Sequence, residues 1–347
     1  MQRLLWWAHL GLSAVTLLAY ASPYISPAHF WPASFAALAY PTLLVAHLAL
    51  AGWWLYRRSW RWLLSLLIVV GGYDALLRHV GLPAQRDAEA HTLTVASYNM
   101  LGGRRVYHDD PDVLADRVAS LLRCVDADVV AFEEYTALPE LRRALDKAFA
   151  KTGLPHVRRS TVSYLALYSR YPILETQQLA SYNAANGAMR CRVDVAGDTL
   201  DVVVAHLRSN QIAVDAEQLV ADAAQANRRA LWTVRTVARN YRRAARQRAL
   251  DAEALARDLE ALPYPTVVLG DLNDVPLSYT LGTLRRAGLR DAFRQNGSGL
   301  GVTYAGSLPG LRIDYVLASP ELTPLSAEVV DCDFSDHEAV RAAFTWP

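Results

Sequence analysis

Five short polar motifs, each at the end of an apolar run, constrain what the chain from residue 92 onwards can fold into. The motifs are Ser97-Tyr98-Asn99, Glu133-Glu134, His206-Leu207, Gly270-Asp271-Leu272-Asn273 and Ser335-Asp336-His337. The preceding runs are rich in Val, Ile, Leu and Ala, which is typical of buried strands. In open α/β sheets, polar side chains at the carboxyl ends of strands build binding sites. The pattern therefore predicts strands whose carboxyl ends meet at one site lined by carboxylate, imidazole and amide groups.

The periodicity around these motifs alternates between strand and helix. Alternation of period two predicts a strand over 93–99, and apolar residues at helical spacing predict a helix over 112–126. Gly197-Asp198 separates two apolar runs and predicts a hairpin turn. The remaining predicted elements are a helix over 139–149 and strands over 129–132, 164–169, 189–195, 199–205, 265–269 and 312–318. The sequence therefore predicts a mixed α/β domain.

The five motifs, in this order and joined by Ile313-Asp314-Tyr315, resemble those of the endonuclease/exonuclease/phosphatase superfamily, which includes deoxyribonuclease I. The resemblance covers about Thr92 to Phe344. It implies an α/β (α+β) four-layer sandwich, in which two mainly antiparallel sheets are flanked by helices. It also implies hydrolysis of phosphate esters. Nucleic acids, nucleotides, inositol phosphates and sphingolipids are all substrates within the family, and no motif here selects among them.

The resemblance also implies a metal site. Glu134 aligns with the family's metal-binding glutamate, Asn99 is expected to assist through its amide oxygen, and Asp336 completes the acidic side. Oxygen ligands of this kind suit Mg2+ or Mn2+. The family usually has Gln at the position of Glu133. Which of the two neighbouring carboxylates faces the metal is therefore left open.

The same resemblance assigns the catalytic groups. Asp271 resembles the carboxylate that orients or activates the attacking water, and Asn273 resembles the amide that holds the phosphate. His337 resembles the catalytic histidine, with Asp314 bonded to its other ring nitrogen and fixing its tautomer. His206 resembles the second histidine, which donates to a nonbridging oxygen or assists the leaving group. Such an assembly suits phosphoryl transfer, because negative charge accumulates on the nonbridging oxygens.

The first 86 residues have a different composition from the rest of the chain. They contain six arginines and one acid, Asp74, whereas the remainder has 29 basic and 33 acidic residues. Apolar runs near 20 residues fit the bilayer core. The three runs cover about 4–20, 33–56 and 60–77. We therefore expect a three-helix transmembrane segment over 1–86 and a catalytic domain over 87–347. Asp74, one turn from Arg78, is expected at the membrane interface.

The positive charges predict the orientation of these spans. Arg57, Arg58 and Arg61 lie between the second and third runs, whereas 21–32 has no Lys or Arg, so the arginine turn is expected in the cytoplasm. An odd number of spans then places the catalytic domain outside the cytoplasm. The alternative is a cleaved signal peptide ending near Ala21, followed by a buried helical pair.

A helical, arginine-rich insertion is predicted over about 211–262, because Gly and Pro are absent between about Asp215 and Leu262. One interpretation is a solvated helix with an arginine face. The other is an arm that contacts anionic lipid headgroups or a polyanionic substrate.

The three cysteines, Cys124, Cys191 and Cys332, are far apart and odd in number, so they indicate no disulfide framework. One pair could form, but buried thiols are the expectation.

The sequence thus predicts a membrane-anchored, metal-dependent phosphoesterase, nuclease-like, that hydrolyses phosphodiester or phosphomonoester bonds. An alternative within the same enzyme class is a phosphoesterase that acts on lipid headgroups, similar to sphingomyelinases, or on inositol phosphates. A second alternative is a non-catalytic binding protein that retains the fold. It is disfavoured because every polar position expected from the resemblance is filled. The partners expected are the phosphate-ester substrate and the membrane, and the sequence indicates no protein partner.

Overall fold

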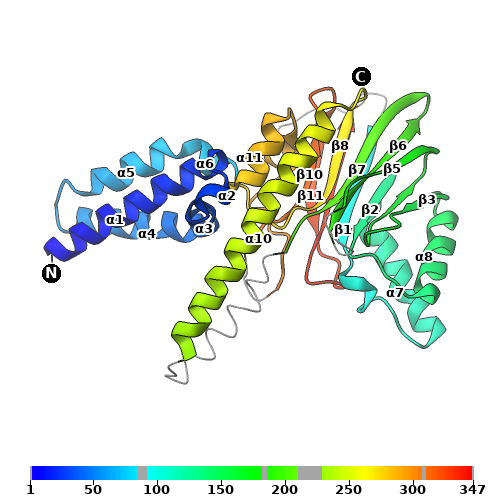
Figure 1. Ribbon diagram of the computed structural model, residues 1–347, viewed down its shortest axis with the longest axis horizontal. Helices are drawn as coiled ribbons and strands as arrows, with labels where there is room; N and C mark the ends of the chain where they lie inside the picture. The colour runs from blue at the N-terminus through cyan, green and yellow to red at the C-terminus, as the bar shows by residue number, and fades with distance from the viewer. Residues whose placement is uncertain (1, 84–91, 182–185, 210–228, 307–309, 346–347) are drawn as a thin grey trace.

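The computed structural model describes residues 2–83, 92–181, 186–209, 229–306 and 310–345, and Figure 1 shows their arrangement. Two six-stranded sheets pack against each other, and a bundle formed by the N-terminal helices projects from one side. The chain after residue 92 therefore forms one sandwich, with the N-terminal helices outside it.

The first sheet has the strand order β11-β12-β1-β2-β4-β3. Its strands are β1 Thr92–Asn99, β2 Val129–Glu133, β3 His156–Arg159, β4 Ala166–Ser169, β11 Thr323–Val330 and β12 Ala339–Thr345. The second sheet has the order β5-β6-β7-β8-β10-β9. Its strands are β5 Ile173–Ser181, β6 Gly187–Val195, β7 Asp198–His206, β8 Thr266–Asp271, β9 Arg290–Asp291 and β10 Asp314–Ala318.

Each sheet is mixed in the same way. β1 pairs in parallel with β2, and β7 pairs in parallel with β8, while the other pairs are antiparallel. The predicted sandwich of two sheets flanked by helices is confirmed. The parallel pairs matter for function, because they bring the carboxyl ends of neighbouring strands to the same edge.

Alternation along β1 explains the layers. Leu93 and Val95 lie in the core between the two sheets, whereas Ala96 and Tyr98 lie in a second core beneath the outer helices. Helices α7 (Pro111–Cys124) and α8 (Pro139–Lys151) cover the first sheet. Helices α10 (Arg229–Glu260) and α11 (Tyr279–Arg286) cover the second. The short helix α12 (Ala292–Asn296) follows β9. Both sheets are therefore buried on both faces.

The predicted helical insertion corresponds in part to α10. This helix begins at Arg229, and the first part of the predicted insertion, residues 211–228, lies outside the described residues. Its C-terminal half contributes Leu255, Ala256 and Leu259 to the core beneath α10 and α11.

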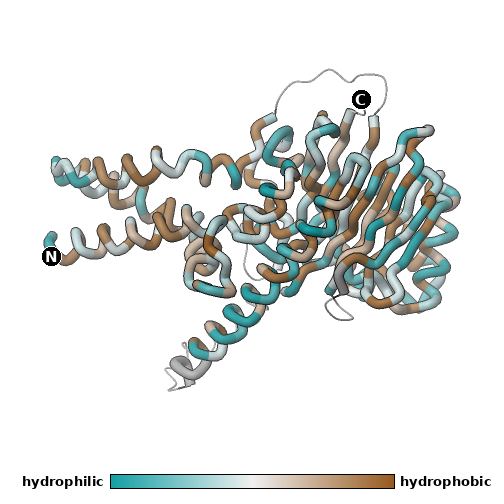
Figure 2. Tube along the Cα trace, turned by 45° about the horizontal axis from the view of Figure 1, so that its top comes forward, coloured by the Kyte–Doolittle hydropathy of each residue, from teal (hydrophilic) through white to brown (hydrophobic). Residues whose placement is uncertain are grey.

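The N-terminal helices form a bundle that stands away from the sandwich (Figures 1 and 2). The elements are α1 Gln2–Ala21, η1 Ser22–Tyr24, α2 Pro27–Phe30, α3 Pro32–Leu38, α4 Tyr40–Tyr56, α5 Trp62–Gly71 and α6 Tyr73–Leu77. α1, α4 and α5 pack along one another, and Figure 2 shows their predominantly hydrophobic residues.

The prediction of three transmembrane helices is wrong, because the second and third apolar runs do not form continuous helices of sufficient length. Among the described helices, only α1, continued by η1 to Tyr24, is by itself long and apolar enough to cross a membrane. A signal sequence near the N-terminus has the same length and composition. The second run is bent by 65° between α3 and α4, where Pro41 lacks the N–H that a continuous helix needs. The third run is divided at Gly71-Gly72, which leaves α5 with 10 residues.

The bundle is fastened to the sandwich by polar contacts. Arg286 donates from Nη1 to the carbonyl of Pro23 at 2.8 Å. Asp74 forms ion pairs with Arg78 at 2.7 Å and with Arg294 at 3.0 Å. The side chain of Asp74 is 58% exposed, so it lies at the junction of bundle and sandwich rather than inside the bundle.

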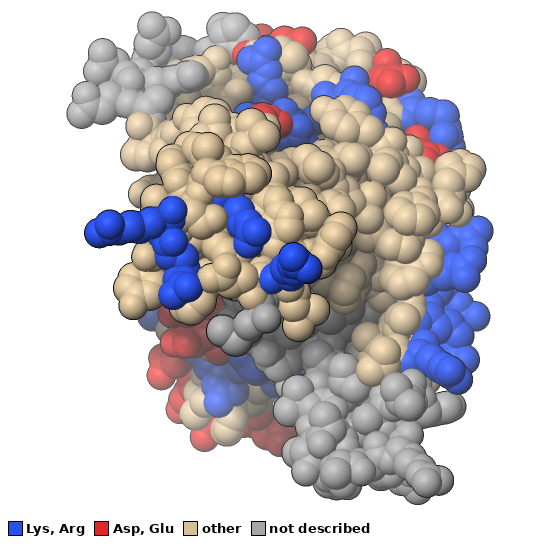
Figure 3. Space-filling model, turned by 90° about the vertical axis from the view of Figure 1, so that its left-hand side faces the viewer, with Lys and Arg blue, Asp and Glu red and all other residues tan. Residues whose placement is uncertain are grey.

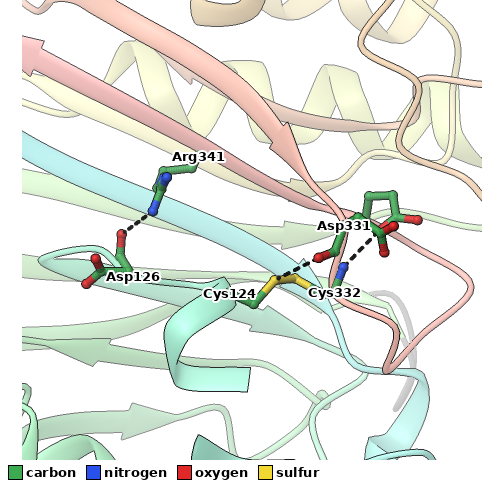
Figure 4. Close-up of a disulfide and its surroundings, with 6 residues drawn as sticks. Cys124, Asp126, Asp331, Cys332 and Arg341 are labelled. Carbon is green, nitrogen blue, oxygen red and sulfur yellow. Dashed lines mark hydrogen bonds between the residues drawn. A yellow bond between two sulfur atoms is a disulfide. The ribbon is translucent and has the colours of Figure 1, made fainter. Parts of the chain in front are cut away.

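Cys124 and Cys332 form a disulfide, which contradicts the expectation of buried thiols for these two residues (Figure 4). Cys191 is buried and free, as expected. The disulfide joins the end of α7 to the loop between β11 and β12. The two cysteines are 208 residues apart, and no sequence pattern indicates that they would meet. Beside the bridge, Arg341 donates to the carbonyl of Asp126 at 3.1 Å.

The double change Cys124→Ser with Cys332→Ser is expected to lower the free energy of unfolding by about 2–5 kcal/mol, because the bridge closes a long loop. The thermal midpoint measured with and without reductant checks this. Reductant should lower the midpoint of the native chain and leave that of the double variant unchanged. Equal midpoints for all four samples would show that the bridge does not contribute.

Candidate active site

The strand registers bring the polar motifs to one edge of the sandwich. Asn99 is paired in register with Glu133 on the parallel strands β1 and β2. Asp271 is paired with Asp314 on the antiparallel strands β8 and β10. His337 lies in the loop before β12, not at the carboxyl end of a strand as predicted. Because β12 runs antiparallel to β1, the start of β12 lies beside the end of β1, and the histidine still reaches the site.

Asp271 is the centre of this arrangement, and its carboxylate is held by three N–H donors. Asn273 donates its backbone N–H to Oδ1 at 2.8 Å and its side-chain Nδ2 to Oδ2 at 3.0 Å. Asn99 donates Nδ2 to Oδ2 at 3.1 Å. Asp271 is 1% exposed. Burial and the charge of Asp314 raise its pKa, and the nearby histidines oppose this shift.

Two imidazoles flank Asp271. Nε2 of His206 lies 3.6 Å from Oδ2 of Asp271, and Nε2 of His337 lies 3.8 Å from the same oxygen. Nδ1 of His337 is bonded to Asp314 at 3.0 and 3.1 Å, which is the pairing that the sequence predicted. Both ring nitrogens of His206 are buried and lack a hydrogen-bond partner among the described residues. His206 therefore offers unused donor and acceptor capacity toward a ligand.

Burial alone would lower the pKa of His337, but the carboxylates of Asp314 and Asp271 outweigh it and raise the pKa to about 10. The imidazole is therefore protonated at neutral pH. A cation on this side of the site suits the stabilisation of phosphate oxygens.

The two neighbouring glutamates have different environments. Glu134 has a side chain that is 39% exposed, and its Oε1 accepts from Nδ2 of Asn99 at 3.5 Å. Glu133 is fully buried and accepts from Oγ of Ser97 at 2.9 Å. Burial and the charge of Asp314 raise the pKa of Glu133 well above its usual value. A protonated Glu133 is uncharged, like the glutamine that the family usually has there, and Glu134 is the more exposed of the two carboxylates.

Close approach of β7 and β8 requires a glycine. Gly270 has φ of +147°, and a Cβ built on it would lie 1.8 Å from the carbonyl oxygen of Ala205. Glu134 and Asn273 also have positive φ, +45° and +53°. Such conformations are uncommon for a glutamate and are often retained at functional sites.

Asp336 is placed differently from the other predicted metal ligands. Its carboxylate accepts from Oγ of Ser335 at 3.3 Å, and no hydrogen bond or ion pair joins it to Asn99 or Glu134 within the described part of the chain. The set Asn99, Glu134 and Asp336 therefore stays a prediction.

A tighter group, formed by Asp271, Asp314 and His337, has ligand atoms within 4.8 Å of one another and could hold a metal ion. Its His337 Nδ1 is already bonded to Asp314, however. An ion bound through that nitrogen would have to break the bond.

Two supporting residues had no sequence signal. Oγ1 of Thr303 accepts the backbone N–H groups of Ile313 and Asp314 at 3.0 and 3.1 Å, which fixes the start of β10. The ring of Tyr304 packs edge-on against His337 at 5.3 Å between centroids. Both are common residue types in an irregular segment, so only the folded chain reveals their role.

Asp314→Asn is expected to act through His337, because the carboxylate holds that ring and its proton. We expect Asp314→Asn alone to lower turnover by about a hundredfold, the range for loss of acid–base function. Combined with His337→Ala, it should cost little more than His337→Ala alone. Steady-state kinetics of the four proteins in this cycle test the coupling. Additive losses would show that Asp314 acts independently.

Comparisons with known proteins agree with this geometry. Residues 96–337 match the Endonuclease/Exonuclease/phosphatase family, and residues 2–79 match a Domain of unknown function (DUF8431). A search of curated proteins gave no match.

Similar solved structures include D. rerio TDP2 complexed with a single-strand DNA product, at 18% identity and a TM-score of 0.51, covering 74% of this chain and 100% of that one. The endonuclease/exonuclease/phosphatase from Beutenbergia cavernae DSM 12333 has 20% identity and a TM-score of 0.49, covering 74% and 72%. Sphingomyelinase C from Streptomyces griseocarneus has 16% identity and a TM-score of 0.46, covering 74% and 100%. At these identities the likeness shows the fold alone.

The family match spans more than half of the chain and includes every polar motif described above. The protein therefore belongs to the Endonuclease/Exonuclease/phosphatase family, whose enzymes are hydrolases that act on phosphoester bonds and generally use divalent metal ions.

Proposed function

We propose that the protein is a membrane-attached, metal-dependent phosphoesterase that hydrolyses phosphodiester bonds, with nucleic acid as its substrate class. The observation that carries this proposal is the convergence of Asp271 with two imidazoles and two amides at one edge of the sandwich. Asp271 Oδ2 lies within 3.1 Å of an Asn99 donor and 3.6 Å of His206 Nε2. An assembly of this kind can orient water and bind phosphate oxygens at the same time.

The residues present fit a divalent ion. The exposed carboxylate of Glu134 offers the kind of oxygen ligand that suits Mg2+ or Mn2+. Asn99 turns Nδ2 toward Glu134, and its Oδ1 accepts the backbone N–H of Leu101 at 3.0 Å, so the amide would have to turn over to offer its oxygen to the ion. Asp336 would complete this set after a change of its side-chain position. When bound, the ion supplies positive charge to the nonbridging phosphate oxygens.

The chain's own residues supply the rest of the reaction. Asp271 orients a water and accepts its proton as the water oxygen bonds to phosphorus, while the bond from phosphorus to the leaving oxygen breaks. Asn273 holds the carboxylate in place through its backbone and side-chain N–H groups, and its amide would have to release Leu207 to bind a phosphate oxygen. Protonated His337 stabilises the developing charge. His206, with both nitrogens unused, donates to a nonbridging oxygen or to the leaving group.

Membrane embedding of the N-terminal bundle is supported by its inverted polarity. Its outer surface is apolar, with Leu4 76%, Trp7 70% and Leu67 69% exposed. Its interior is polar instead. Ser65 Oγ lies 2.9 Å from His9 Nε2, and both side chains are buried. Polar side chains that bond across helices, surrounded by exposed apolar ones, are typical of helices packed in lipid.

The orientation proposed places the catalytic domain outside the cytoplasm. Arg57, Arg58 and Arg61 lie around the turn between α4 and α5, and Figure 3 shows basic side chains at the free end of the bundle. Positive charge at that end favours its cytoplasmic location. The disulfide of the sandwich suits an oxidising compartment.

A second candidate substrate is the phosphodiester of a lipid headgroup. The exposed apolar surface of the bundle favours it, because membrane attachment would keep the site near lipid. Both candidates use the same site and differ in the group attached to the phosphate.

The test is a hydrolysis panel with the full-length protein in detergent and in lipid nanodiscs, supplemented with Mg2+ or Mn2+. Single-stranded DNA, plasmid DNA, RNA, mononucleotides, inositol phosphates and sphingomyelin are compared side by side. Cleavage of nucleic acid at a higher kcat/KM than any other substrate supports the proposal. Preference for sphingomyelin would replace it with the second candidate, and no hydrolysis at all would favour a binding protein that retains the fold.

A further inference from the structure

The N-terminal half of α10 carries a stripe of arginines. Residues 229–250 contain seven arginines and no acid. Arg235, Arg239, Arg242 and Arg246 are spaced by four, three and four residues, which places them along one face over about three turns of the helix. All four are exposed. We call these four residues the arginine stripe.

The rest of this half-helix is held in place by the N-terminal region. Tyr241 is 1% exposed, and its ring packs edge-on against Phe35 at 5.4 Å and Trp31 at 6.3 Å. Ala244 and Ala245 are also buried. Because Tyr241 and the arginine stripe lie on different faces, this packing leaves the stripe exposed and sets its position relative to the bundle.

The stripe lies on the bundle's side of the molecule. In Figure 1 the N-terminal end of α10 points away from the sheets, toward the side from which the bundle projects. Figure 3, which faces the free end of the bundle, shows a column of basic side chains beside it where α10 lies. A membrane that surrounds the bundle would therefore lie close to the stripe.

A solvated helix surface usually mixes the two signs of charge. Within the part of the chain that the structure describes, no ion pair joins any of the four arginines to an acid. Like charges three or four residues apart on a helix repel one another. An anionic surface offsets this repulsion and attracts the arginines. Each arginine near such a surface raises the membrane-partition coefficient roughly fivefold.

We propose that the arginine stripe binds the anionic phospholipid headgroups of the membrane in which the bundle is embedded. This inference rests on the embedding proposed above. The bundle and α10 then contact one membrane at two places, through apolar side chains within the bilayer and through arginines at its surface. The contact fixes the tilt of the catalytic domain over the membrane.

The test labels arginines of the full-length protein with a neutral dicarbonyl reagent and maps the modification rate by mass spectrometry. The protein is held in nanodiscs of phosphatidylcholine alone or with about one third phosphatidylglycerol. Arg123 and Arg143 are internal controls, because both are exposed and lie on α7 and α8, at the opposite end of the molecule (Figure 1). We expect modification of the stripe to slow by at least about fivefold in anionic nanodiscs. The control rates should not change, and high salt should restore the stripe's rate.

Each other outcome has a defined meaning. Equal rates in neutral and anionic nanodiscs, with the protein firmly incorporated, would overturn the inference and leave the proposed embedding intact. Failure of the chain to enter nanodiscs would overturn the embedding and the inference together. A further arm adds single-stranded DNA to the neutral nanodiscs. Protection of the stripe by DNA but not by anionic lipid would assign it to nucleic acid and overturn the lipid assignment.

Discussion

Asp271→Asn is expected to lower turnover by about a thousandfold, within the range for loss of a general base or water-orienting group. The substitution keeps the size of the side chain and removes the charge that lies between the two imidazoles, 3.6 and 3.8 Å from their Nε2 atoms. The measurement is kcat on a chromogenic phosphodiester with saturating Mg2+ or Mn2+. The asparagine keeps one acceptor oxygen in place of the two that Asn273 and Asn99 now use, so the thermal midpoint is measured beside kcat to show that the fold is kept.

A matched control is Asp198→Asn. Asp198 is exposed at the turn between β6 and β7, so its substitution removes one negative charge without touching the site. The control should retain full turnover. Turnover of Asp271→Asn within a few-fold of the native protein, with the same thermal midpoint, would remove Asp271 from the catalytic machinery.

The two neighbouring glutamates are expected to respond in opposite ways. Glu134→Gln should lower activity by about a hundredfold or more and raise the metal concentration needed for half-maximal rate, because Glu134 is the exposed carboxylate beside Asn99. Glu133→Gln should be mild, because Glu133 is buried and its raised pKa favours the neutral form, which glutamine resembles.

The pair of variants is its own control, since the same chemical change is made at adjacent positions. Metal titrations of the initial rate distinguish them. If Glu133→Gln were the damaging change and Glu134→Gln the mild one, the assignment of the metal-facing carboxylate at the end of β2 would be off by one residue.

Many strands of the sandwich could be predicted, because the alternation of side chains along a strand shows which face each residue buries. Leu93 and Val95 face one core and Ala96 and Tyr98 the other, as period two requires. The site could be predicted wherever a polar residue ends a strand whose neighbour is parallel. Asn99 on β1 and Asp271 on β8 are examples, and both face the same edge.

The remainder depends on contacts that one-dimensional patterns do not contain. His337 reaches the site from the start of β12, because antiparallel pairing with β1 reverses which end of a strand lies there. Cys124 meets Cys332 across 208 residues. The second apolar run is long enough to span a membrane by composition, but Pro41 favours a bend that a hydropathy pattern ignores.

The difference in burial between Glu133 and Glu134 could also be seen only in the folded chain. The two residues are neighbours in the sequence, but in the fold Glu133 is fully buried beside Asp314, whereas the side chain of Glu134 is 39% exposed.

The most direct measurement of the central claim is the metal dependence of phosphodiester hydrolysis by the full-length protein. Initial rates are measured after chelation with excess EDTA and again after Mg2+ or Mn2+ is restored, with Asp271→Asn as the parallel sample. The account predicts no hydrolysis above background in EDTA, recovery on adding the metal, and no recovery for Asp271→Asn. Full activity of the native protein in excess EDTA would contradict it.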